Sequence, residues 1–99
     1  MKFLVAWDDR DGLDDAQAAE LLAAFGRWTP PTGLVFHQFL NRADGRGGFA
    51  VVETDSPTDL LDAPSKFGPW LEFDIVPVVD IADGVAVLAD ALEFRALGA

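Results

Sequence analysis

Four short runs of the chain are apolar at nearly every position, and this pattern predicts a sheet with two covered faces. The runs are Lys2–Trp7, Leu34–Leu40, Phe49–Thr54 and Trp70–Val79. A strand whose sheet has one face in water alternates apolar and polar residues, and these runs mostly do not. A chain of 99 residues has too few helices to cover both faces of such a sheet. We therefore expect a second copy of the chain to cover the remaining face.

The segments between and after these runs predict three helices. The first spans about Leu13–Trp28 and ends before two prolines, which cannot continue it. The second begins near Ser56, whose side chain can cap it, and Pro64 is expected to make it short or irregular. The third begins at Asp80 or Asp83 and is expected to direct its apolar residues inward. These residues are Val85, Leu88, Leu92 and Leu97.

The order of strands and helices predicts an α+β fold. Asp44-Gly45 supplies the turn pair of a hairpin between the second and third strands. The order β-α-β-β-α-β, followed by a helix, is the ferredoxin-like plan, with two helices on one face of an antiparallel sheet. Pro77 lacks an N–H group, which places the last strand at a sheet edge or this residue near the end of pairing. We expect residues 1–99 to form one domain, and two subunits to pack sheet to sheet as a dimeric α/β barrel.

The charge of the chain limits its partners. Seventeen Asp and Glu against seven Lys and Arg give a net charge of −10, which disfavours nucleic acid and anionic membranes as partners. No apolar run approaches the roughly 18 residues of a membrane span, and the first run is too short for a signal peptide. We therefore expect a soluble, cytoplasmic protein.

The chain has no cysteine, which excludes disulfides, thiolate nucleophiles and zinc–thiolate sites. An acidic run after the first strand, Asp8-Asp9-Arg10-Asp11-Gly12, has some carboxylates of a calcium loop. It lacks the alternating ligand positions and the terminal Glu of such a loop, so we interpret it as a solvated turn. We expect no metal and no cofactor.

His37, the only histidine, lies inside an apolar strand. Strand alternation groups it with Val35 and Phe39 on one face. If the hairpin pairs Val35 with Glu53, the carboxylate lies one diagonal from the imidazole. His37 would then be a candidate general acid or base, oriented by Glu53. The alternatives are a hydrogen-bonded structural histidine and a solvated Glu53 at the strand end.

The three tryptophans all lie at the ends of expected helices or strands, where the mouths of pockets occur. An aromatic-lined pocket between sheet and helices suits a flat, apolar ligand. The alternative is that these residues fill the core and the interface. The expected ligand-binding residues are Trp7, Trp28, Phe39, Val51 and Trp70.

Three stretches, Lys2–Trp7, Gly47–Asp55 and Trp70–Asp80, together with Pro30–Gly33, carry a resemblance to a known family. With them the chain resembles a family of small bacterial proteins catalogued as domain of unknown function 3303. The resemblance implies a ferredoxin-like dimeric barrel and no particular reaction, because none of the shared stretches is a catalytic motif. Pro64 departs from the continuous second helix that we expect in the family.

Three functions are compatible with this sequence. The first is a dimeric barrel protein that binds a small hydrophobic molecule in an aromatic-edged pocket. The second is a cofactor-independent enzyme, similar to a monooxygenase, isomerase or cyclase, with His37 as its acid or base. The third is a non-catalytic structural dimerisation domain.

Overall fold

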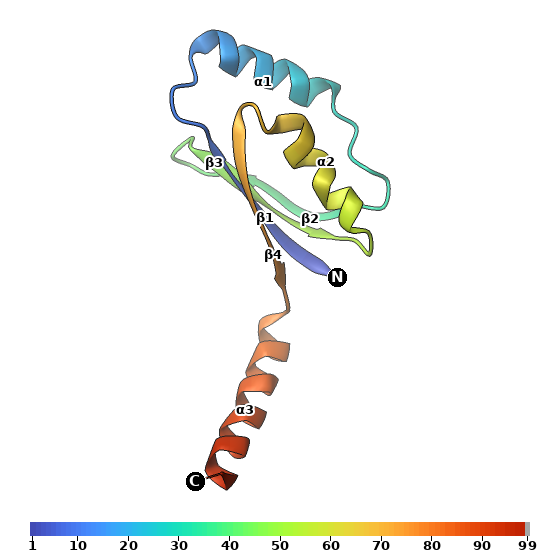
Figure 1. Ribbon diagram of the computed structural model, residues 1–99, viewed down its shortest axis with the longest axis vertical. Helices are drawn as coiled ribbons and strands as arrows, with labels where there is room; N and C mark the ends of the chain where they lie inside the picture. Colours follow the sequence, from blue (N-terminus) through green and yellow to red (C-terminus); the bar gives the residue numbers. More distant parts are fainter. Residues whose placement is uncertain (99) are drawn as a thin grey trace.

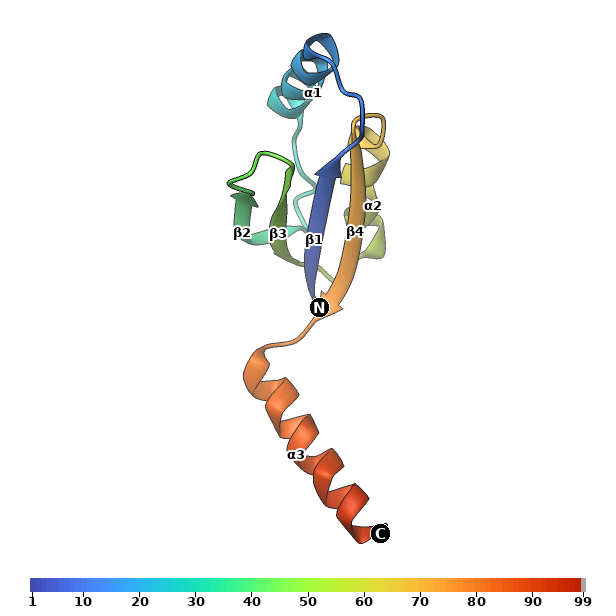
Figure 2. The ribbon, with the colours of Figure 1, turned by 90° about the vertical axis from the view of Figure 1, so that its left-hand side faces the viewer.

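Residues 1–98, described by a computed structural model, form a four-stranded antiparallel sheet, two helices over one face and a third helix beyond the sheet (Figure 1). Figure 2 shows the strands side by side in the order β2-β3-β1-β4, with α2 behind them. This order confirms the predicted ferredoxin-like α+β fold, and it places Pro77 in an edge strand. The elements are β1 (Lys2–Asp9), α1 (Asp15–Arg27), β2 (Val35–Asn41), β3 (Gly47–Glu53), α2 (Pro57–Phe67), β4 (Leu71–Val78) and α3 (Ile81–Leu97).

The two covering helices begin in different ways. Asp14 caps α1: its Oδ1 accepts a hydrogen bond from Gln17 N at 2.8 Å, and Gln17 Oε1 accepts one from Asp14 N at 3.0 Å. Ser56 occupies the cap position of α2, but its side chain makes no capping hydrogen bond, so that expectation is wrong. The expectation for Pro64 is also wrong. It removes one backbone donor near the end of the helix, and α2 continues through it.

An irregularity in β2 changes which residues share a face. Gln38, rather than His37, pairs with Val51, because the register shifts between Phe36 and Gln38. Alternation with a period of two residues does not hold across such a bulge. Phe36 and Phe39 therefore both line the helix-covered side of the sheet. The predicted grouping of His37 with Phe39 is wrong for this reason.

The apolar core of the described chain is small. Its buried apolar side chains are Ala50, Val52, Phe67 and Leu71, and α1 contributes none. The face of the sheet opposite α1 and α2, called the open face below, carries further apolar residues that lie opposite one another on neighbouring strands. Its central row is Leu4, Val51 and Val76.

Helix α3 projects away from the end of β4 and does not return to the sheet (Figures 1 and 2). At its start, Asp80 Oδ1 accepts a hydrogen bond from Lys2 Nζ at 2.7 Å, which ties the helix to the end of β1. The prediction that α3 directs its apolar residues inward is wrong for the single chain. Only two residues separate β4 from α3, and the helix continues away from the sheet instead of folding back onto it. Its exposed large apolar residues are Ile81, Val85, Val87, Leu88, Leu92, Phe94 and Leu97.

Within residues 1–98, no helix is both long enough and apolar enough to cross a membrane.

Candidate functional site

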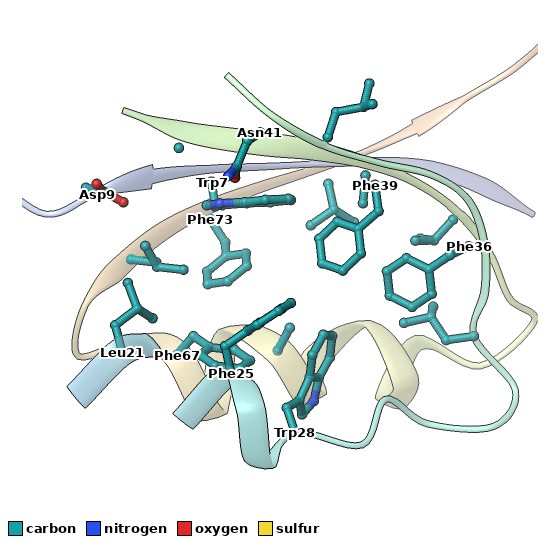
Figure 3. A pocket seen from close by; sticks show the side chains of 18 of the residues that line it. Trp7, Asp9, Leu21, Phe25, Trp28, Phe36, Phe39, Asn41, Phe67 and Phe73 are labelled. Carbon is teal, nitrogen blue, oxygen red and sulfur yellow. The ribbon is translucent and has the colours of Figure 1, made fainter. Parts of the chain in front are cut away.

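A cavity of about 580 Å³ separates the sheet from α1 and α2 (Figure 3). Seven aromatic side chains form much of its wall, and they come from both layers. The sheet contributes Trp7, Phe36, Phe39 and Phe73, and the helices with their C-terminal flanks contribute Phe25, Trp28 and Phe67.

Phe39 joins the aromatic side chains of the two layers. Its ring stacks on Phe36 with centroids 5.1 Å apart, and Trp7 meets it edge-on at 5.6 Å. From the helix layer, Phe25 approaches it edge-on at 6.0 Å. Offset-stacked and edge-to-face contacts at these separations are the favourable arrangements of aromatic pairs. Phe39 therefore links the sheet wall to the helix wall at one side of the cavity.

Glycine makes room for the indole of Trp7. A Cβ atom at Gly48, opposite Trp7 in the paired register, would overlap the Trp7 ring and the carbonyl oxygen of Leu40. The carbonyl belongs to the backbone and has little freedom to move. A glycine at this position is therefore what allows Trp7 to lie flat along the cavity.

A hydrogen bond fixes Trp28 on the helix side. Trp28 Nε1 donates to Asp62 Oδ2 at 2.9 Å, and Asp62 Oδ1 also pairs with Lys66 Nζ at 2.8 Å. Burial pushes the pKa of Asp62 upward, but the hydrogen bonds from Lys66 and Trp28 outweigh it and hold the pKa below its ordinary value of 3.8. The indole also packs edge-on against Phe67, with centroids 5.3 Å apart.

The polar residues of the cavity wall are few and none is basic. They are Asp9, Asn41 and Asp59, and no lysine, arginine or histidine lines the cavity in the described chain. Asp59 is half-buried, and its Oδ2 accepts a hydrogen bond from the buried Thr54 hydroxyl at 3.2 Å. Asp9 lies exposed at the end of β1.

His37 and Glu53 form a hydrogen-bonded pair outside the cavity. His37 Nε2 lies 2.8 Å from Glu53 Oε1, and the two side chains are 44% and 51% exposed. Glu53 faces Lys2 in the paired register, on the open face. The pKa of Lys2 is raised, first by its hydrogen bond to Asp80 and then by the negative charges of Asp80 and Glu53. This end of the open face therefore carries two adjacent acid–base pairs.

The residues expected to bind a ligand fall in three places. Trp7, Trp28 and Phe39 line the cavity. Val51 lies on the open face, and Trp70 borders a separate hollow beside the end of α1. Four further aromatic residues line the cavity but were not among those expected from the sequence: Phe25, Phe36, Phe67 and Phe73. For Phe25 a signal was present, because it belongs to the apolar stripe of the first helix.

The acidic run Asp8–Gly12 overlaps the end of β1, and two of its residues are held in ion pairs. Asp8 pairs with Arg42 at 3.3 Å, and Arg10 pairs with Glu72 at 3.2 Å. Among residues 1–98, no group of three or more histidine, aspartate and glutamate side chains is placed to hold a metal ion.

Replacing Asp62 by Asn should lower the melting temperature at neutral pH. The folded pKa of Asp62 is lowered, so its charge stabilises the fold above the ordinary pKa of 3.8, and this stabilisation is lost as pH falls through the folded pKa. We expect a loss of about 1 kcal/mol near pH 7 that disappears in acid. Thermal unfolding of the wild type and Asp62→Asn from neutral to acidic pH tests this. Asp90→Asn, on the exposed α3, is the charge-matched control, and a difference that persists in acid would contradict the assignment.

No match to the chain is found among curated proteins. The sequence pattern of one family does match, over residues 1–92 of the 99, and its description is "Domain of unknown function (DUF3303)". The match covers the whole sheet, both covering helices, every residue of the cavity wall and most of α3. The resemblance that the sequence indicated is thereby confirmed: the chain belongs to the DUF3303 family.

Proposed function

We propose that the protein is a homodimer in which each subunit binds a small, flat, apolar molecule in the aromatic cavity. The observation that carries the proposal is the cavity of about 580 Å³ walled by seven aromatic side chains. Ligand pockets measure roughly 300–1,000 Å³ and are mostly apolar, with a few polar groups that orient the ligand. The three polar wall residues, Asp9, Asn41 and Asp59, are suited to that orienting role.

The size of the cavity favours a ligand over a simple packing defect. Protein interiors are close-packed, and an engineered cavity of about 150 Å³ is already large enough to bind benzene. Side chains around an empty apolar space forgo dispersion contacts on one side. A flat apolar ligand restores those contacts with the rings from both layers, and its binding therefore stabilises the fold.

The open face supports the homodimer. Val35, Phe49 and Val76 are 53%, 38% and 39% exposed there, although they belong to regular strands of the sheet. A second copy offers the same apolar face, and two such faces pack into the α/β barrel expected from the sequence. The proposal also gives the exposed apolar residues of α3, which projects past its own sheet, the partner subunit as a surface to contact.

The hydrogen bond between His37 and Glu53 favours a second candidate function, that of a cofactor-independent enzyme. An imidazole held 2.8 Å from a carboxylate is the arrangement of an oriented general base. The pair lies on the open face, so its substrate would lie between the two sheets of the dimer and not in the aromatic cavity. The third candidate, a structural dimerisation domain, needs neither site. A cytoplasmic location stays a prediction.

Ligand binding is tested by titrating methylnaphthalene, a flat neutral probe, into the protein in a calorimeter. We expect saturable binding with one site per subunit. Phe39→Ala should weaken it about tenfold or more, because a cavity-lining ring is lost. Phe94→Ala, the same substitution on α3 outside the cavity wall, is the matched control. Equal affinity in the two variants, or no binding by the wild type, would contradict the proposal.

The homodimer is tested by sedimentation of the wild type and of Val51→Glu. The introduced charge lies in the central row of the open face, and burying it without a partner should convert the dimer to a monomer. Leu61→Glu is the control, because Leu61 is 61% exposed on α2, away from the open face. Each subunit carries −10, so added salt should strengthen the dimer by screening like charges. A wild type that sediments as a monomer rules out this assembly.

His37→Ala separates the enzyme from the other two candidates. If the open face is catalytic, the variant keeps its melting temperature and dimeric state but loses turnover of any substrate that the wild type converts. Glu53→Gln should reduce turnover without abolishing it, since the amide keeps a hydrogen-bonding oxygen near His37. Turnover that survives His37→Ala would remove this candidate.

A further inference from the structure

We propose that the aromatic cavity selects a flat organic cation over neutral and anionic molecules of the same shape. The inference rests on the proposed function, because it names the chemical class of ligand that the same cavity takes. Three properties of the wall point to it: the charge of its polar residues, the kind of aromatic surface it offers, and the pairing of the nearby basic side chains.

The charged residues of the wall are acidic. Asp9 and Asp59 are its carboxylates, and Asn41 is neutral. The two carboxylates lie at opposite ends of the cavity, because Asp9 closes β1 while Asp59 follows the end of β3, and these strands are antiparallel. Figure 3 shows Asp9 at one end of the space, on the side of Trp7 and Asn41. A flat ligand in the cavity therefore has one of the two carboxylates near each of its ends, whichever end carries the positive group.

The aromatic surface favours the same charge. The wall contains two tryptophans and five phenylalanines, and the chain has no tyrosine, so the rings bring no hydroxyl groups. The faces of such rings are electrostatically negative and attract cations, an interaction that strengthens when the cation is desolvated. One of the two indole N–H groups, that of Trp28, already donates to Asp62. The rings therefore offer an anion little hydrogen bonding to offset its desolvation.

Three basic side chains close to the cavity are held in ion pairs outside it, whereas Arg27 and Arg46, which adjoin the lining residues Trp28 and Gly47, make no ion pair within residues 1–98. Lys66 pairs with Asp62 at 2.8 Å, and Arg42 pairs with Asp44 at 2.6 Å. Arg10 donates to the carbonyl of Gly68 at 2.6 Å as well as to Glu72. The net charge of −10 adds an attractive field for cations around the whole molecule. The acidic wall and the negative net charge of the chain therefore both favour a positively charged ligand.

The test compares three flat bicyclic probes by calorimetry: N-methylquinolinium, methylnaphthalene and naphthoate. The first two have nearly the same shape and differ in charge, and the third is the anion. We expect the cation to bind about tenfold more tightly than the neutral probe, and the anion to bind most weakly. If the neutral probe binds and the cation binds no more tightly, this inference fails and the proposed function stands. If no probe binds, both fail.

Single substitutions then assign the selectivity to the wall. Asp59→Asn and Asp9→Asn should each lower the affinity for N-methylquinolinium more than the affinity for methylnaphthalene, so that the ratio of the two affinities falls. Retained binding of methylnaphthalene shows that the cavity is intact. Asp55→Asn and Asp11→Asn are the controls, because they remove the same charge from neighbouring positions that do not line the cavity. An equal loss in the controls would assign the selectivity to net charge alone and overturn the role of the wall.

Discussion

A sheet with apolar side chains on both faces must be covered on both, and two helices cover only one. This constraint governs the rest of the molecule. Helices α1 and α2 lie over one face, while the row of Leu4, Val51 and Val76 faces outward on the other. The third helix, which could in principle have folded back over that row, projects away from the sheet instead. The apolar side chains of the open face and of α3 are therefore left exposed in the single chain.

On the covered face, large rings hold the layers apart. Gly48 lets the Trp7 indole lie along the sheet, and Asp62 holds the Trp28 indole on the helix side. Phe39 bridges between them, since its ring contacts aromatic side chains of both layers. A core built from smaller aliphatic residues would close under these helices. The aromatic composition of this wall is what keeps the cavity open, and the acidic residues at its two ends are the basis of the proposed preference for a cation.

Much of the fold could be predicted from the sequence because its signals are local. The apolar runs, the Asp44-Gly45 turn and the prolines after the first helix each mark a boundary within a few residues. The bulge at His37 has no such signal, since one extra residue in a strand changes neither its composition nor its length appreciably. It moved Phe39 into the cavity wall beside Phe36 and left His37 on the open face, beside Glu53. The apolar residues of α3 indicated burial, but a pattern along one chain does not say which molecule provides the surface.

Amide hydrogen exchange of the full-length chain, measured over a dilution series alongside sedimentation, tests most directly whether a second copy covers the leftover apolar surface. Exchange reports protection separately for α3 and for each strand. If a second copy covers this surface, the amides of α3 and of β2, an edge strand of the sheet, exchange slowly at high protein concentration. Their exchange becomes faster as the dimer dissociates on dilution. A monomer at all concentrations, with exchange in α3 independent of dilution, would contradict it.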